Sequence, residues 1–264
     1  MIRLFATDLD GTLLKRGNII KQEDIDAIGR LHEQQIDFAV ATGRMERDII
    51  RISQEIKHDA HRISQNGAFA HTKNNDVILA NTFDVATSKA LHKAVSAFTT
   101  PFCITTADEA YISFKTPEIK AMDDYAYFPI VEGVDFEDDY NDEFLPSRYM
   151  LIGDEKDILN SQKQIDEAFH EVSESYQSDP RCVDIVPKGV SKAAGLTALA
   201  KHLHIELHEI AVIGDSFNDI PMFNMTPHSF AMSTAPKTVQ QQAAHVVDDV
   251  FEAIDFIQSK VSTS

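Results

Sequence analysis

The stretch that decides the fold is residues 3–12, RLFATDLDGT, in which a short apolar run ends in two carboxylates and a glycine. The run predicts a buried strand, and in a parallel sheet the residues beyond a strand's carboxyl end reach the ligand-binding crevice. Asp8 and Asp10 are two residues apart along an extended chain, and both reach that crevice only if the backbone turns at Leu9 or Gly11. Two acids so placed suit a reaction in which one attacks phosphorus and the other moves a proton.

Two other interpretations fit this segment taken alone. Asp-x-Asp-Gly after a strand is also ordinary turn sequence. A calcium loop of the EF-hand type would need glycine at its sixth position, whereas Gly11 is at the fourth position counted from Asp8, so that interpretation fails. The catalytic interpretation therefore depends on partners elsewhere in the chain.

Composition narrows the class of protein. The chain has 264 residues, enough for one large or two modest domains, and its 43% hydrophobic and 25% charged residues are typical of a globular protein. The net charge of −18 argues against a nucleic-acid partner, because phosphate binding rests on clustered basic side chains. Cys103 and Cys182 are too few for a disulfide framework or a zinc site.

The sequence also bears on location. It begins directly with the predicted strand rather than with a charged and apolar leader, so we do not expect secretion. No run approaches the roughly 18 apolar residues that a membrane span requires. We therefore predict a cytoplasmic protein that binds neither membrane nor nucleic acid, as a monomer or a weak homodimer.

Strands and helices alternate at both ends of the chain. Residues 38–41 form an apolar run that ends in Thr42-Gly43-Arg44, and residues 63–68 end in the turn signal Asn66-Gly67. The pattern resumes near residue 186, with the apolar run 210–213 ending in Gly214-Asp215. Such alternation predicts an α/β fold with a doubly wound parallel sheet.

The middle of the chain, residues 83–185, has a different character. It holds short aromatic-rich runs and one amphipathic helical pattern over 158–172, which predicts an α+β insert without strand-end chemistry. Residues 135–143 are acidic and aromatic, and we expect them to form a solvated loop.

Three predicted strands thus end in polar residues: the first at Asp8 and Asp10, the second at Thr42-Gly43, and the third in residues 214–219, GDSFND. If the sheet is parallel, all three ends lie at one edge. Turn sequence alone does not account for three such endings in one chain.

These segments resemble the four motifs of the haloacid dehalogenase (HAD) superfamily, specifically the Cof-type sugar-phosphate phosphatases with a C2-type cap. The matching segments are FATDLDGTLL at 5–14, ATGR at 41–44, GVSK at 189–192 and GDSFNDIPM at 214–222. Their order and spacing fit over essentially the whole chain, and the first and fourth are highly specific. The resemblance implies a discontinuous Rossmann-like HAD core, residues 1–82 and 186–264, and a C2-type cap domain, residues 83–185.

The resemblance also implies a reaction and a cofactor. Asp8 would be the nucleophile that forms an aspartyl-phosphate, and Asp10 would be the acid and base that serves the leaving group and then water. Asp8, the backbone carbonyl of Asp10 and Asp215 would hold Mg²⁺. The expected substrate is a small phosphorylated metabolite, for which a sugar phosphate is the first candidate.

Four residues would bind the phosphoryl group according to the same resemblance. They are Thr42, Gly43 through its amide, Lys192 and Asn218. Lys192 would also support catalysis, since it lies at a predicted helix start where anions bind. Together with Mg²⁺ it would offset the repulsion among the converging carboxylates.

Some roles stay open at this point. Arg44 either points into the crevice or lies on a helix surface, and Asp219 is expected to orient Lys192 or a metal-bound water rather than to bind metal. A phosphomutase would use the same first step with a second sugar hydroxyl as acceptor. A receiver-like phosphoacceptor is disfavoured by Asp10 and by the long insert. The sequence does not name the substrate.

Overall fold

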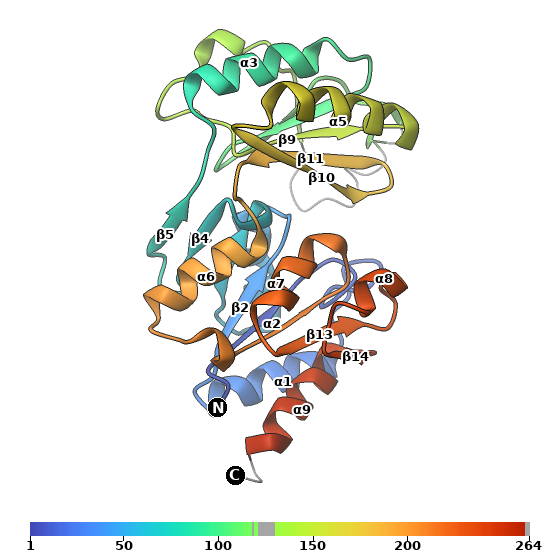
Figure 1. Ribbon diagram of the computed structural model, residues 1–264. Coiled ribbons are helices and arrows are strands. Elements are labelled where there is room, and N and C mark those ends of the chain that lie inside the picture. Colours follow the sequence, from blue (N-terminus) through green and yellow to red (C-terminus); the bar gives the residue numbers. More distant parts are fainter. Residues whose placement is uncertain (118, 121–129, 262–264) are drawn as a thin grey trace. The chain divides into compact units, whose positions relative to one another are not determined.

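The computed structural model of the protein describes residues 1–117, 119–120 and 130–261. The chain divides into two compact units: Met1–Ala80 with Ser191–Ser264 form the first, and Asn81–Val190 form the second. The sequence-based prediction placed the two domain boundaries after residues 82 and 185, and the structure places them after residues 80 and 190. The second unit is therefore inserted into a first unit that is discontinuous in sequence, as the colours of Figure 1 show.

The first unit is built on one sheet. Its strands are β1 (Leu4–Thr7), β2 (Asp37–Ala41), β3 (His61–Ser64), β4 (Phe69–His71), β5 (Val77–Ala80), β12 (Ile210–Gly214), β13 (His228–Met232) and β14 (His245–Val247). They form an eight-stranded sheet in the order β14-β13-β12-β1-β2-β3-β4-β5. All neighbours from β14 to β3 are parallel, which confirms the predicted parallel sheet.

The last two strands on one side of this sheet depart from the prediction, because β4 runs antiparallel to β3 and β5 runs antiparallel to β4. Only the 3₁₀ turn η1 (Gln65–Gly67) and Ala68 separate β3 from β4. A parallel connection needs a crossover of a dozen or more residues, so a link this short returns the chain antiparallel.

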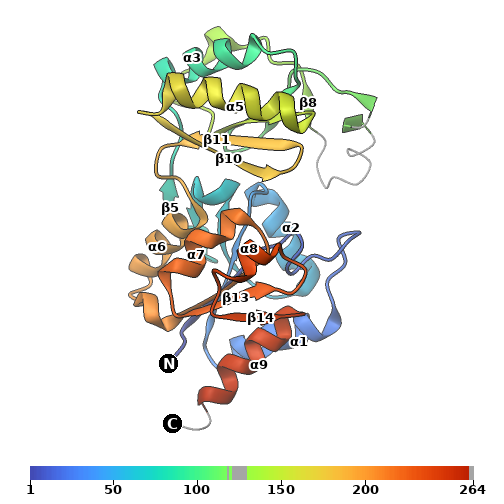
Figure 2. The same cartoon turned by 45° about the vertical axis from the view of Figure 1, so that its right-hand side comes forward.

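Helices cover this sheet. They are α1 (Gln22–Glu33), α2 (Glu46–Ile56), α6 (Lys192–His202), α7 (Ile220–Met225), α8 (Lys237–Gln240) and α9 (Val250–Val261), with 3₁₀ turns η3 (Leu207–Glu209) and η4 (Phe217–Asp219). Helices α1 and α9 pack side by side, as both Figure 1 and Figure 2 show, and α6 packs beside α7. Among the residues that the structure describes, no helix is long and apolar enough to cross a membrane.

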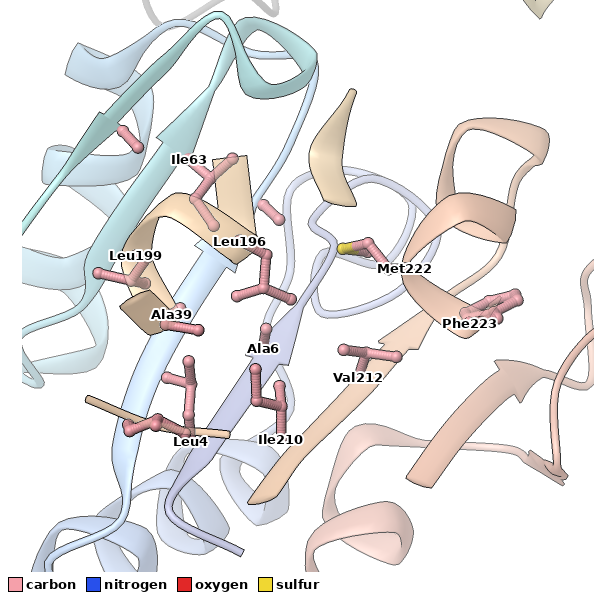
Figure 3. Packing of buried hydrophobic residues seen from close by; sticks show 14 of the residues in the cluster. Leu4, Ala6, Ala39, Ile63, Leu196, Leu199, Ile210, Val212, Met222 and Phe223 are labelled. Atoms are coloured by element: carbon pink, nitrogen blue, oxygen red, sulfur yellow. The ribbon is translucent and has the colours of Figure 1, made fainter. Parts of the chain in front are cut away.

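The core explains why the first strand is an unbroken apolar run. Figure 3 shows Leu4 and Ala6 of β1 packed beneath Leu196 and Leu199 of α6. Phe5, between them in sequence, points to the opposite face and is also buried. A strand that is buried on both faces favours apolar residues on both, as in other parallel sheets, and the one polar residue of β1, Thr7, donates its hydroxyl to the carbonyl of Asp8 at 2.7 Å.

The strand order places the polar strand ends together. Strand β1 lies between β2 and β12, and Thr7 pairs with Val40 on one side and with Ile213 on the other. The chain leaves β1 toward β2 and later returns on the other side at β12. This reversal marks the ligand crevice of doubly wound sheets, and it confirms that the three predicted strand ends share one edge.

The second unit has its own sheet and helices. Its elements are α3 (Val85–Ser96), β6 (Phe102–Thr105), β7 (Ala110–Ile112), β8 (Val131–Glu132), η2 (Glu137–Asp139), β9 (Arg148–Ile152), α5 (Glu155–Phe169), β10 (Ser173–Asp179) and β11 (Cys182–Pro187). The six-stranded sheet has the order β10-β11-β9-β6-β7-β8, with antiparallel neighbours except β7 and β8. The predicted α+β character of the insert is confirmed.

The expected solvated loop at residues 135–143 is only partly solvated. Its acids in η2 are exposed, but Tyr140 is buried, and its hydroxyl lies 2.9 Å from Nδ1 of His92 and 3.3 Å from the Tyr149 hydroxyl. Burial of an aromatic ring whose hydroxyl finds polar partners is favourable, so the ring joins the core while the acids stay in water.

Candidate active site

The first motif enters the site through a turn at Gly11. Asp8 follows β1 directly, is buried, and its backbone N–H donates to the carbonyl of Ile213 at 3.0 Å. Gly11 has a φ of +83°, and a Cβ at this position would lie 2.3 Å from Oδ2 of Asp215. The glycine therefore both permits the turn and leaves room for a carboxylate of the fourth motif.

Lys192 joins the first and fourth motifs. It is buried in the first turn of α6, and its Nζ donates to Oδ1 of Asp8 at 2.6 Å and to Oδ1 of Asp219 at 2.7 Å. Ser191 is the N-cap, and its Oγ accepts the N–H of Ala194 at 3.1 Å. The helix start also packs closely on the third strand's turn, because a Cβ on Gly67 would lie 2.0 Å from the Ser191 carbonyl oxygen.

Both carboxylate oxygens of Asp219 already accept hydrogen bonds. Its Oδ1 accepts from Lys192, and its Oδ2 accepts the backbone N–H groups of Asp215 at 2.9 Å and Ser216 at 3.0 Å. Gly214 makes this possible, since a Cβ there would lie 2.3 Å from Cγ of Asp219. This geometry favours the role of orienting Lys192 over direct metal binding.

The acids form a compact cluster. One carboxylate oxygen from each of Asp8, Asp215 and Asp219 lies within 4.8 Å of the others. Burial raises the pKa of Asp8 well above its ordinary value, and burial together with the charge of Asp219 raises the pKa of Asp215 to about 6. Burial opposes the charge on Lys192, but the carboxylates of Asp219 and Asp8 outweigh it and raise its pKa. One ammonium thus faces three carboxylates, an excess of negative charge.

This donor set fits a divalent cation. Carboxylate oxygens are the ligands that Mg²⁺ prefers, and a cation would offset both the burial of these carboxylates and their mutual repulsion, which raise the two pKa values. Because Asp219 is already engaged, Asp8 and Asp215 are the side chains that would hold the ion. Thr12 supports Asp215 by donating from Oγ1 to Oδ1 at 3.3 Å.

The carboxylate of Asp10 stands outside the acid cluster and is paired with Arg44. Its side chain is 58% exposed. Nε of Arg44 donates to Oδ2 at 2.8 Å and Nη2 donates to Oδ1 at 2.5 Å, the fork geometry of a bidentate pair. Arg44 therefore points to the site rather than lying on the surface of α2. Only the backbone carbonyl of Asp10 was expected to bind metal, and that role stays a proposal.

The second motif meets the fourth through a residue that sequence reasoning missed. Thr42 follows β2, is buried, and its Oγ1 accepts the N–H of Arg44 at 3.2 Å. A Cβ on Gly43 would lie 3.2 Å from Oδ1 of Asn66, and that oxygen accepts from Nδ2 of Asn218 at 3.0 Å. Asn66 thus lies against Gly43 and is hydrogen-bonded to Asn218, two of the predicted phosphate-binding residues.

A signal for Asn66 was present in the sequence. It lies in η1 immediately after β3, with a left-handed φ of 58°, and was interpreted as part of a turn. The turn is real, but it follows a fourth strand that ends at the same edge as β1, β2 and β12. A polar side chain there reaches the site for the same reason as the others.

Comparison with known proteins agrees with this geometry. The family model of the haloacid dehalogenase-like hydrolases matches residues 5–253, nearly the whole chain. The chain belongs to this family. The predicted superfamily is therefore confirmed, and so is the prediction that the protein is an enzyme, a hydrolase.

Relatives of the family show how far the likeness extends. An HMP-PP phosphatase of Escherichia coli O157:H7 is 25% identical over 250 residues, which covers 93% of this chain and 89% of that protein. A haloacid dehalogenase-like hydrolase from Bacteroides thetaiotaomicron has a TM-score of 0.86 at 21% identity, covering 97% of this chain and all of that one. The subclass IIB sugar phosphatase BT4131 has a TM-score of 0.83 at 21% identity, covering 97% and 99% of the two chains. The two structures show that the fold is shared.

Proposed function

We propose that the protein is a Mg²⁺-dependent phosphatase that hydrolyses phosphate monoesters of small metabolites through an aspartyl-phosphate on Asp8. The observation that carries the proposal is the buried contact of Lys192 with both Asp8 and Asp219 beside Asp215. Three acids and one ammonium at a strand end form a site that accepts a cation together with a phosphate.

In the first step a carboxylate oxygen of Asp8 attacks phosphorus, and the bond between phosphorus and the ester oxygen breaks. For this step Asp10 must carry a proton, so one of its oxygens gives up its hydrogen bond from Arg44; Asp10 then gives that proton to the departing alkoxide, and the product leaves as a neutral alcohol. The partial exposure of the Asp10 side chain suits a group that exchanges protons during turnover.

In the second step water attacks the phosphorus of the aspartyl-phosphate. The carboxylate of Asp10 takes a proton from that water, the bond to Asp8 breaks, and inorganic phosphate leaves. Asp10 is then protonated and ready for the next ester, so the cycle closes without a further reactant.

The other residues of the site would bind the phosphoryl group and neutralise its negative charge. Lys192 lies against the nucleophile, and Thr42, the Gly43 amide and Asn218 would hold the phosphoryl oxygens. Bound Mg²⁺, held by Asp8, the Asp10 carbonyl and Asp215, would neutralise charge on the phosphoryl group. This support matters because monoester hydrolysis without a catalyst is among the slowest known reactions.

The substrate class is inferred from relatives of the chain rather than from the geometry of the site. Relatives named HMP-PP phosphatase, 25% identical, support phosphatase activity on a small metabolite. Sugar phosphates are the first class to test, and the second unit, Asn81–Val190, would act as the cap that selects among them.

The test is phosphate release from a panel of sugar phosphates, nucleotides and an aryl phosphate, with Mg²⁺ and with excess chelator. We expect release with Mg²⁺, none with chelator, and none from Asp8→Asn, while Asp142→Asn, at an exposed loop position, retains full activity. Substantial activity of Asp8→Asn would refute the nucleophile. Transfer between sugars without free phosphate would show a mutase instead.

A further inference from the structure

We infer that Asn18 is a positioning residue for the proposed reaction: it holds the Arg44 guanidinium, which in turn holds the carboxylate of Asp10. Neither Asn18 nor the turn that carries it belongs to the four sequence motifs. The inference rests on the proposed role of Asp10 as the acid that serves the leaving group.

The contact geometry is specific to one nitrogen of Arg44. Nη2 donates to Oδ1 of Asp10 at 2.5 Å and to Oδ1 of Asn18 at 3.1 Å, so both of its hydrogens have acceptors. With Nη2 held from two sides and Nε also bound to Asp10, the plane of the guanidinium is set. The direction of the Asp10 carboxylate is set with it.

Asp10 needs such support because burial does not provide it. Its side chain is 58% exposed, whereas that of Asp8 is 6% exposed and enclosed by the core. An exposed ion pair between flexible side chains contributes little by itself and samples several geometries. A third group that fixes the cation narrows those geometries.

The turn that carries Asn18 is itself well anchored. The backbone groups of Lys15 and Ile19 bond each other in both directions, at 2.9 and 3.3 Å, and Asn18 takes a left-handed φ of 58° between them. Lys15 and Lys21 both contact the carboxylate of Asp249, just before α9, at 3.2 and 2.7 Å. The side-chain amide of Asn18 is therefore carried by a turn that is held in place on both sides.

The role predicts a dependence on the leaving group. An alkoxide is a poor leaving group and needs the proton of Asp10, whereas 4-nitrophenolate departs without one. Because kcat/KM reports the steps up to the departure of the leaving group, a misplaced acid should lower it for an alkyl phosphate and not for 4-nitrophenyl phosphate. A general loss of structure would lower both alike.

The experiment compares three variants of the Mg²⁺-loaded enzyme with the wild type on an alkyl phosphate and on 4-nitrophenyl phosphate. Asn18→Gly keeps the left-handed backbone and removes the amide, and Asn18→Asp keeps an acceptor oxygen. Arg16→Ala changes an exposed residue of the same turn. We expect Asn18→Gly to lose about tenfold in kcat/KM on the alkyl phosphate and less than about twofold on the aryl phosphate. Asn18→Asp and Arg16→Ala should resemble the wild type on both.

Each other outcome has a definite meaning. Equal losses of Asn18→Gly on both substrates, no loss on either, or an Asn18→Asp variant as impaired as Asn18→Gly would overturn the positioning role. A wild type that hydrolyses neither substrate with Mg²⁺ would instead refute the proposed function. Thermal unfolding of each variant shows whether the fold is retained.

Discussion

Two carboxylate–cation pairs lie at the same edge of the sheet, and they are held in opposite ways. Asp8 and Lys192 are enclosed by the core, with side chains 6% and 1% exposed. Asp10 and Arg44 lie toward solvent, at 58% and 23%. In the first pair, packing sets the positions of the atoms. In the second pair, the atoms are positioned by hydrogen bonds, one of which joins Arg44 to Asn18 of a neighbouring turn.

The difference separates stability from activity. Removal of one partner from a buried pair leaves an uncompensated charge in the core, whereas an exposed pair contributes little to the free energy of unfolding. We therefore expect changes in the buried pair to alter folding and catalysis together. Changes in the exposed pair should alter catalysis alone.

The largest effect on stability is expected from Lys192→Met. Asp8 and Asp219 would then remain buried without their cation, at a cost of about 3–5 kcal/mol in the free energy of unfolding. Urea unfolding in the presence of chelator measures this, with Lys201→Met, at an exposed position on the same helix, as control. Added Mg²⁺ should restore part of the loss. Equal stability of the two variants would contradict the energetic role given to the buried pair.

The exposed pair should show the reverse behaviour. Arg44→Ala should lower kcat/KM on an alkyl phosphate by about 10- to 100-fold, since general acid catalysis typically contributes 10²–10⁴. The free energy of unfolding should change by less than about 1 kcal/mol. Arg51→Ala, which removes an exposed pair with Glu55 on α2, is the control and should retain activity. A large loss of stability without loss of activity would reverse the comparison.

A smaller effect should come from Gly11→Ala. The residue has a φ of +83°, and the added Cβ would also collide with Asp215, a proposed metal ligand. Gly189→Ala is a matched control, because its φ of +80° imposes similar strain with no atom within 4 Å. Both should lose about 1–2 kcal/mol of stability. Gly11→Ala alone should need more Mg²⁺ for half-maximal activity, and equal Mg²⁺ requirements would refute the crowding argument.

The smallest expected effect concerns pH. The pKa of Asp215 is raised to about 6 in the folded protein by burial and by Asp219, against an ordinary 3.8. The folded metal-free protein then binds the proton of Asp215 more tightly than the unfolded chain does, so the contribution of Asp215 to stability should decline as pH rises from 4 to 6. Urea unfolding with chelator across this range measures the slope. Asp215→Asn should make the stability of the variant fall less with rising pH than that of the wild type, and an unchanged slope would exclude a contribution from Asp215.

Much of the buried part of the site, around Asp8 and Lys192, could be predicted from the sequence. Asp8 and Asp215 each follow a predicted strand, whose end determines which edge of the sheet the side chain reaches, whereas the resemblance to the third family motif selected Lys192. The short apolar runs before them locate those ends. No knowledge of side-chain rotamers is needed for this inference.

The exposed part of the site, around Asp10 and Arg44, could not be predicted in the same way. Whether Arg44 points to Asp10 or to solvent depends on side-chain torsions, and the position of Asn18 depends on a turn anchored by Lys15 and Lys21 to a residue more than two hundred positions away. Tyr140 was missed for a related reason, because acidic neighbours hide a ring that packs into the second unit's core. Local composition does not report such long-range contacts.

The most direct test of the central claim is to find the phosphoryl group on the enzyme. The Mg²⁺-loaded protein is mixed with 4-nitrophenyl phosphate, quenched in acid within one turnover, and its peptides are analysed by mass spectrometry. The account predicts a transient phosphoryl group on the peptide that contains Asp8, absent with chelator and absent from Asp8→Asn. Phosphate release by the wild type with the phosphoryl group on another residue, or on none throughout the turnover, would contradict it.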